Sequence, residues 1–230
     1  MSNLKNILIN RVSCKSIWFM RQAGRYLPEF REIRSKNKDF IKLCLNSELS
    51  SLITLQPIKR FNLDSAIIFS DILMVPYALG QEVDFTKNFG PRLSNFDQNI
   101  FFQNDKKKFT NKLDPIYKAI EITRNNLDRE KSLISFIGAP WTLLIYMLNL
   151  KTNKNELDLL KLQKNNYNLS EILEELITYL CIHLKNQINA GADVVQIFDS
   201  WAGLIPSSDI ARYCLLPNLK IVEFCKRENI

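Results

Sequence analysis

Four arginines lie close together near the beginning of the chain: Arg21, Arg25, Arg31 and Arg34. A guanidinium group offers a planar fork of N–H donors, which matches the geometry of a carboxylate or a phosphate. Arg21 and Arg25 are four residues apart, and this spacing would place both on one face of a helix. The pattern indicates a site for an anionic ligand, and the alternative interpretation is a solvated helix face.

Polar residues also follow three apolar segments, which cover residues 65–69, 133–137 and 194–198. Asp71 comes shortly after the first segment and Asp199 directly after the third. In a β/α barrel, such carboxylates would lie just beyond the carboxyl ends of strands, where barrel enzymes carry their chemistry. Each aspartate is therefore a candidate for catalysis or binding, or alternatively caps the helix that follows it.

The elements that must position these residues can be predicted from local patterns. The three apolar segments are continuous rather than alternating, which is typical of parallel strands covered on both faces. Residues 171–190 carry leucines and isoleucines at helical spacing, with Asn168 or Ser170 to cap the helix and Gly191 to end it. Strands separated by helices predict an α/β fold, either a barrel or an open doubly wound sheet. No Gly-rich phosphate loop follows a strand in the sequence, so the barrel is favoured.

Length and composition narrow the class of protein. The chain has 230 residues, of which 46% are hydrophobic and 24% charged, and this excludes a disordered chain, a collagen and a coiled coil. Residues 94–114 and 149–169 are rich in asparagine and lysine and are interpreted as surface excursions and peripheral helix rather than domain boundaries. The run Lys106-Lys107-Lys108 is expected to face solvent.

The net charge of +7 comes from the beginning of the chain. Residues 1–60 carry 12 lysines and arginines against 4 acidic residues, whereas the rest of the chain carries 19 against 20. A local excess of this kind can attract nucleic acid, a membrane surface or a small polyanion. Because residues 61–230 are almost neutral and carry no visible recognition module, nucleic-acid binding is not expected.

Cysteine and histidine usage predicts neither a disulfide framework nor a metal site. The five cysteines have no CxxC or CxH spacing, and the single histidine, His183, lies within the predicted long helix. No zinc-ligand set can be assembled from these residues, and the thiols are expected to be reduced. The sequence has neither an apolar run of about 20 residues nor a secretory signal, so we expect a soluble, cytoplasmic protein without a membrane segment.

Four blocks of the sequence together resemble the uroporphyrinogen decarboxylase family. They occur in the family's order and approximate spacing, which makes a chance match implausible. The blocks are Trp18-Phe-Met-Arg-Gln-Ala-Gly-Arg25 with Tyr26-Leu-Pro-Glu-Phe30, Ile67-Ile-Phe-Ser-Asp-Ile-Leu73 with Val75-Pro-Tyr-Ala-Leu-Gly80, Gly138-Ala-Pro-Trp-Thr-Leu143 with Tyr146-Met147, and Gly191-Ala-Asp-Val-Val-Gln-Ile-Phe-Asp-Ser200.

The resemblance implies a distorted (β/α)8 barrel of the TIM type that is usually a homodimer and works without a metal or an organic cofactor. Residues 1–230 would then form a single domain that covers roughly the N-terminal two-thirds of the family barrel. The implied reaction converts the four acetate side chains of uroporphyrinogen III to methyls, giving coproporphyrinogen III and CO2 in haem biosynthesis. Because this substrate carries eight carboxylates, the arginines near the beginning of the chain would serve to bind a polyanion.

The resemblance also implies roles for individual residues. Loss of CO2 from a pyrrole acetate needs an electron sink, which protonation of the adjacent ring carbon provides, and a carboxylate near the pyrrole N–H groups would stabilise the resulting cation. By resemblance Asp71 takes this position, and Arg21 and Arg25 hold substrate carboxylates and are the other catalytic candidates. The implied substrate-binding residues are Arg21, Gln22, Ala23, Gly24, Arg25, Phe30, Asp71, Tyr146 and Ser200.

Structural roles compete with these assignments. Tyr146 is alternatively a packed aromatic and Ser200 a helix cap, while Arg31 and Arg34 are interpreted as a solvated face. His183 is interpreted as a partly buried histidine of the helix surface.

The sequence also departs from the family pattern. The family's Gly-rich turn after Tyr146-Met147 is here Leu148-Asn149-Leu150, and the family's late Gly-His-Gly motif is absent. A complete barrel takes about 250 residues, so we expect that the chain is C-terminally incomplete. Two alternative functions follow: a catalytically inactive remnant, and a zinc- and cobalamin-dependent methyltransferase of the same superfamily, for which a His/Cys ligand set is missing.

Overall fold

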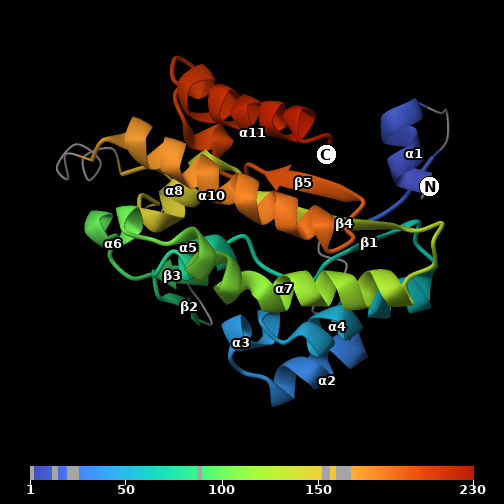
Figure 1. Cartoon of the computed structure of the whole chain (residues 1–230). Coiled ribbons are helices and arrows are strands. Elements are labelled where there is room, and N and C mark those ends of the chain that lie inside the picture. Colours follow the sequence, from blue (N-terminus) through green and yellow to red (C-terminus); the bar gives the residue numbers. More distant parts are fainter. Residues whose placement is uncertain (1–2, 12–14, 20–25, 87–89, 152–155, 159–166) are drawn as a thin grey trace. The chain divides into compact units, whose positions relative to one another are not determined.

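The computed structural model describes residues 3–11, 15–19, 26–86, 90–151, 156–158 and 167–230 (Figure 1). The chain divides into two compact units that alternate along the sequence. Unit 1 comprises Met1–Asp71, Leu113–Phe136 and Leu184–Gln196, and unit 2 comprises Ile72–Lys112, Ile137–His183 and Ile197–Ile230. The expectation of a single domain over residues 1–230 stays a prediction.

Three strands form the larger sheet, in the order β1-β4-β5. Strand β1 (Ser65–Ile67) runs parallel to β4 (Ser132–Gly138), with Ala66 opposite Leu133. The predicted strands are therefore confirmed, although β1 ends two residues before the end of its apolar segment. Strand β5 (Val194–Phe198), at the end of the order, has side chains that are only half-buried, so the expectation that both of its faces are covered is wrong for this strand.

Three helices of unit 1 follow one another closely and lie side by side: α2 (Pro28–Lys36), α3 (Phe40–Cys44) and α4 (Ser47–Phe61) (Figure 1). Side chains cap the N-termini of α3 and α4. Asp39 accepts a hydrogen bond from the Lys42 N–H at 3.0 Å, and Asn46 accepts one from the Leu49 N–H at 2.9 Å. These caps satisfy backbone donors that have no partner within the helix.

The described helices outside this group are α1 (Asn3–Asn10), α5 (Met74–Ala78), α6 (Gln98–Phe102), α7 (Lys106–Asn126), α8 (Pro140–Met147), α10 (Leu169–Asn189), η1 (Ala202–Leu204), η2 (Ala211–Leu215) and α11 (Leu216–Arg227). Helices α7 and α10 contribute residues to both units. In unit 2, α11 and η2 pack against α8.

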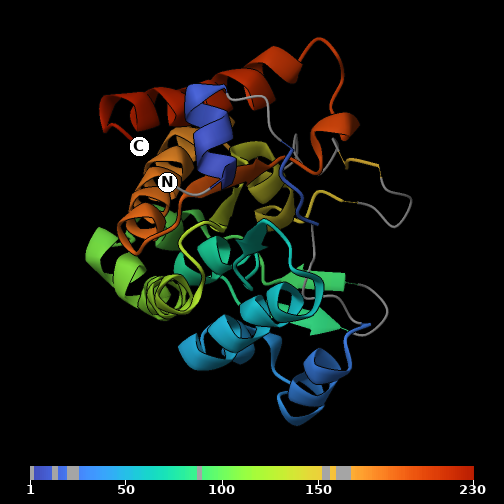
Figure 2. The ribbon, with the colours of Figure 1, turned by 90° about the vertical axis from the view of Figure 1, so that its right-hand side faces the viewer.

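A β-hairpin in unit 2 was not predicted from the sequence. Strand β2 (Val83–Thr86) pairs antiparallel with β3 (Gly90–Leu93), and these are the two green arrows in Figure 2. The segment 94–114, expected to form a surface excursion and peripheral helix, contains α6 and the first residues of α7. Phe109 is fully buried there, whereas the lysine run before it faces solvent as predicted.

The long predicted helix is confirmed as α10, within two residues at each end. The Glu171 N–H donates to Asn168 Oδ1 at 3.4 Å, and Gly191 has a φ of 108°, as expected for the residues that begin and end the helix. His183 differs from expectation: it is 5% exposed, and its ring packs edge-on against Phe109. It is a core residue rather than a surface histidine because α10 buries this face.

Within the described part of the chain, none of the helices combines the length and the apolar character that crossing a membrane requires.

Candidate functional site

Asp71 stands four residues beyond the end of β1, and hydrogen bonds from α4 hold the segment that leads to it. The Phe69 N–H donates to Thr54 Oγ1 at 2.9 Å, and the Ser50 hydroxyl donates to the Phe69 carbonyl at 2.6 Å. The Thr54 hydroxyl in turn donates to the Ser50 carbonyl at 2.7 Å. Two buried hydroxyls one helical turn apart therefore satisfy the backbone of Phe69 and place the partly exposed Asp71 two residues later.

Aromatic rings support the same segment. The Phe69 ring lies 5.8 Å from Phe30 and 5.8 Å from Phe40, edge-on to both. Phe30 is 6% exposed and belongs to the core cluster of unit 1 with Leu27 and Leu43. In this structure Phe30 supports the Asp71 segment from the core, and the expectation that it contacts a macrocycle stays a prediction.

A buried thiol lies near Asp71. Burial, and then the charge of Asp71, raise the pKa of Cys44 well above its usual value, while the guanidinium of Arg34 opposes this shift. Arg34 also lies 5.7 Å from the centre of the Phe40 ring. Asp71 and Arg34 therefore act electrostatically on the same neighbourhood, and Arg34 is half-buried rather than part of a fully solvated face. The sequence carried no signal for this beyond the arginine cluster itself.

The predicted anion-binding loop, Arg21, Gln22, Ala23, Gly24 and Arg25, lies outside the described residues. The roles assigned to these five residues stay predictions.

In unit 2, the last residue of β4 is a glycine with little room for a side chain. A Cβ atom on Gly138 would lie 2.8 Å from Leu143 Cδ2, closer than real Cβ contacts, and 3.1 Å from Ile72 Cβ, which is tighter than most. Helix α8 begins at Pro140, two residues beyond the end of the strand. Tyr146, one of the predicted binding residues, is on this helix and is half-buried.

A hydrogen-bond network ties α8 to the residues that follow β5. The buried Thr142 hydroxyl donates to Asp199 Oδ1 at 2.7 Å and accepts from the Trp201 N–H at 3.1 Å. The Trp141 Nε1–H donates to the Trp201 carbonyl at 3.3 Å. Asp199 thus bonds to the Thr142 side chain of α8. It does not cap the helix that follows it, because the N-cap residue of η1 is Trp201. The Trp201 backbone is held at both its N–H and its carbonyl.

Two further residues contact the Asp199 carboxylate. The Asn218 side-chain amide donates to Asp199 Oδ2 at 3.4 Å. Burial, followed by the charge of Asp199 and a hydrogen bond to it, raises the pKa of the Cys214 thiol to about 12. Asp199 is therefore a structural acceptor that joins α8, η2 and α11 to the end of β5. The adjacent Ser200 is exposed, and its predicted binding role stays a prediction.

Aromatic and cationic side chains gather around Trp201. The Tyr146 ring lies 5.8 Å from the Trp201 ring at 64°, and Lys151 Nζ lies 4.3 Å from the centre of the same indole. Sequence analysis missed Thr142, Trp201 and Lys151. Thr142 belongs to the third quoted block and Trp201 directly follows the fourth, so their positions could have been examined, whereas Lys151 carries no local signal.

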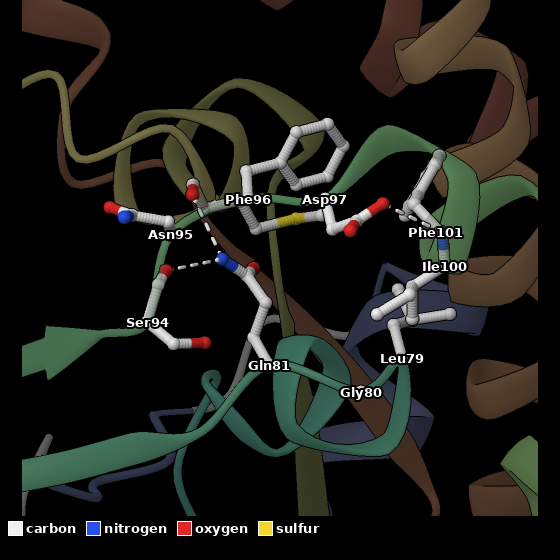
Figure 3. A pocket seen from close by; sticks show the side chains of 10 residues that line it. Leu79, Gly80, Gln81, Ser94, Asn95, Phe96, Asp97, Ile100 and Phe101 are labelled. Atoms are coloured by element: carbon white, nitrogen blue, oxygen red, sulfur yellow. Dashed lines mark hydrogen bonds between the residues drawn. The ribbon is translucent and has the colours of Figure 1, made fainter.

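A small cavity of about 80 Å³ lies elsewhere in unit 2, beside α6 (Figure 3). Gln81 Nε2 donates to the carbonyls of Ser94 and Met147, each at 3.0 Å. Asp97 Oδ1 accepts from the Ile100 N–H at 3.1 Å and caps α6. These polar groups stabilise the hairpin and the helix, and the predicted site residues are not among the described residues that line this cavity. In the described ranges, no cluster of three or more His, Cys, Asp or Glu side chains is arranged to hold a metal ion.

Comparison with known proteins gives consistent results for most of the chain. The family model described as uroporphyrinogen decarboxylase (URO-D) matches residues 7–230. A curated protein named uroporphyrinogen decarboxylase from Rickettsia bellii is 41% identical to this chain, over 91% of this chain and 62% of the relative. One of the same name from Roseobacter denitrificans is 44% identical, over 91% of this chain and 62% of the relative. The chain spans about three fifths of the length of these relatives.

A solved structure supports the fold class. A methyltransferase from Methanosarcina mazei superposes with a TM-score of 0.73 at 16% identity, over 97% of this chain and 67% of the other. Together with the parallel strands β1 and β4, this confirms the expected α/β fold. At this level of identity the likeness concerns the fold alone.

Proposed function

We propose that this chain, which belongs to the uroporphyrinogen decarboxylase family, takes part in decarboxylating uroporphyrinogen III. The acetate side chains of this substrate become methyls, giving coproporphyrinogen III and CO2. The observation that carries the proposal is the placement of Asp71. Its carboxylate follows β1 on a segment held by Ser50 and Thr54, and it stays partly exposed.

A carboxylate in this setting can do the chemistry that the reaction needs. Before the carboxylate of an acetate side chain can leave as CO2, the pyrrole ring must become cationic by protonation at the adjacent carbon. The remaining methylene then takes up a proton to become the methyl group, and the ring carbon releases the proton it had gained. Asp71 would accept hydrogen bonds from the pyrrole N–H groups and stabilise that cation as it forms. Because the segment is already held in place, little reorganisation is required at the moment of reaction.

The remaining assignments follow from the family. Arg21 and Arg25, with Gln22, Ala23 and Gly24 between them, would bind substrate carboxylates, and Tyr146 and Ser200 would contact the reacting side chain or another carboxylate. Phe30 would offer an apolar contact. We propose a reaction without metal or organic cofactor, in the cytoplasm, by a homodimer that binds neither nucleic acid nor membrane.

Mutation of Asp71 tests the proposed reaction. The full chain is incubated anaerobically with uroporphyrinogen, and the hepta- to tetracarboxylate products are separated by chromatography. Asp71→Asn should lower turnover by about 10²- to 10³-fold, the range seen when one preorganised electrostatic group is removed. Asp84→Asn, at an exposed position of β2, is the matched control and should keep the wild-type rate.

The outcomes separate the proposed enzyme from its alternatives. Near-normal turnover of Asp71→Asn would remove Asp71 from the mechanism. Absence of every decarboxylated product with the wild-type chain would refute the activity, and retained porphyrinogen binding would then favour the inactive remnant. Zinc content and methyl transfer to a thiol would instead favour the methyltransferase alternative.

A further inference from the structure

The turn after α8 presents Lys151 from a fixed backbone. Asn149 adopts a left-handed conformation, with a φ of 51°, which asparagine tolerates better than most residues. The side-chain amide of Asn149 donates to the Leu93 carbonyl at 3.2 Å, and the Leu150 N–H donates to the Ile145 carbonyl at 3.0 Å. Leu150 is buried, so the turn is anchored on both sides of Asn149. Lys151 follows directly and is exposed.

The ammonium group of Lys151 rests on an aromatic ring. Its Nζ is 4.3 Å from the centre of the Trp201 indole, well inside the range of about 6 Å for a cation–π contact. Among the residues that the structure describes, none forms a salt bridge with Lys151. The contact with the ring face orients the cation, and the N–H donors that point away from the ring can bind an anion.

The backbone that carries the ring beneath the cation is held by α8. The backbone N–H of Trp201 donates to Thr142 of α8, and its backbone carbonyl accepts from Trp141 of the same helix. The same indole packs edge-on against Tyr146 at 5.8 Å. Trp201 therefore contacts both a residue that the family assigns to substrate binding and a cation without an ionic partner among the described residues.

We propose that Lys151 is an anchor for one carboxylate side chain of the polycarboxylate tetrapyrrole, held by Trp201 beside Tyr146. This inference rests on the proposed function, because it names a further binding residue of that substrate. Trp201 is the positioning residue, and Lys151 makes the contact.

Binding can be measured without turnover. The full chain is titrated with uroporphyrin, the oxidised octacarboxylate, and with coproporphyrin, the tetracarboxylate, by porphyrin fluorescence. Lys151→Glu should weaken uroporphyrin binding by roughly tenfold or more, since a favourable charge contact becomes repulsive. Lys151→Arg keeps the charge and stacks on an indole, so it should bind within about threefold of the wild type. Lys107→Glu, at an exposed position of α7, is the charge-matched control and should bind like the wild type.

A double-mutant cycle tests the role of Trp201. If the indole positions the cation, Lys151→Ala should weaken binding much less in a Trp201→Leu background than in the wild type. Equal effects in both backgrounds would refute the positioning role. Circular dichroism of each variant verifies that a binding loss does not come from unfolding, and Lys151→Gln gives a second variant without a new charge.

The failures of the two proposals can be told apart. If the wild type binds uroporphyrin and Lys151→Glu binds it as well as Lys107→Glu does, the anchor is refuted and the proposed function stands. If the wild type neither binds the octacarboxylate nor converts uroporphyrinogen, the proposed function fails and the anchor fails with it. A Lys151-dependent affinity in a chain without turnover would support the anchor alone.

Discussion

Replacing Thr142 by valine would test how much the network around Trp201 contributes. Thr142 is fully buried, and its hydroxyl donates to Asp199 at 2.7 Å while it accepts from the Trp201 N–H at 3.1 Å. Valine has almost the same shape but can make neither hydrogen bond. The substitution therefore removes one bond to a carboxylate and the acceptor of one backbone donor.

The expected cost can be worked out from these two bonds. A hydrogen bond to a charged group contributes about 1.5–3 kcal/mol, and a buried donor left without a partner costs about 1–3 kcal/mol. Trp201 is half-buried, so water can partly replace the lost acceptor, and the added methyl group recovers about 0.8 kcal/mol by burial. We expect Thr142→Val to lower the free energy of unfolding by about 2–4 kcal/mol.

Urea denaturation followed by far-ultraviolet circular dichroism measures this loss. With a denaturant slope of about 3 kcal/mol per molar, the midpoint should fall by about 1 M. Thr142→Ser keeps the hydroxyl and loses only a methyl group, so it is the matched control and should cost about 1 kcal/mol. If the valine variant proves as stable as the serine variant, the hydrogen bonds do not hold Trp201 in the way described.

Three further substitutions test other parts of the structure. Arg124 donates to Asp193 Oδ2 at 2.8 Å and to carbonyls of the turn before β4. Arg124→Ala should therefore cost about 3 kcal/mol in urea, and a loss no larger than that of Arg129→Ala, at an exposed position of the same turn, would contradict this. Burial lowers the pKa of His183 to about 3, so the unfolded chain takes up a proton below pH 6.5 that the folded chain does not. This contribution to the free energy of unfolding should be fully present above about pH 6.5 and should fall towards pH 3 by about 1.4 kcal/mol per pH unit. An unchanged pH slope in His183→Gln would show that His183 does not cause the loss of stability. Gly138→Ala should cost about 2 kcal/mol because the new Cβ meets Leu143 at 2.8 Å, and thermal melts that match the wild type would show that the site relaxes freely.

Local patterns in the sequence were enough to predict several elements and the resemblance to the family. The strands β1, β4 and β5, the helix α10 and the left-handed Gly191 were all predicted, because side-chain periodicity and glycine conformation depend on near neighbours. The short hairpin of β2 and β3 was missed, since each strand has only four residues and its pairing depends on its partner. The roles assigned to Asp71 and to the loop from Arg21 to Arg25 stay predictions from the family resemblance.

Only the tertiary structure decided how side chains far apart in the sequence share their surroundings. Thr142 and Asp199 are 57 residues apart and form one hydrogen bond, and Lys151 meets Trp201 only because α8 fixes both the turn and the indole. Packing likewise buries His183 in the core and places Arg34 where its charge acts on the Cys44 thiol. Such contacts depend on which faces the elements bury against each other, and a sequence read through its local periods does not contain that information.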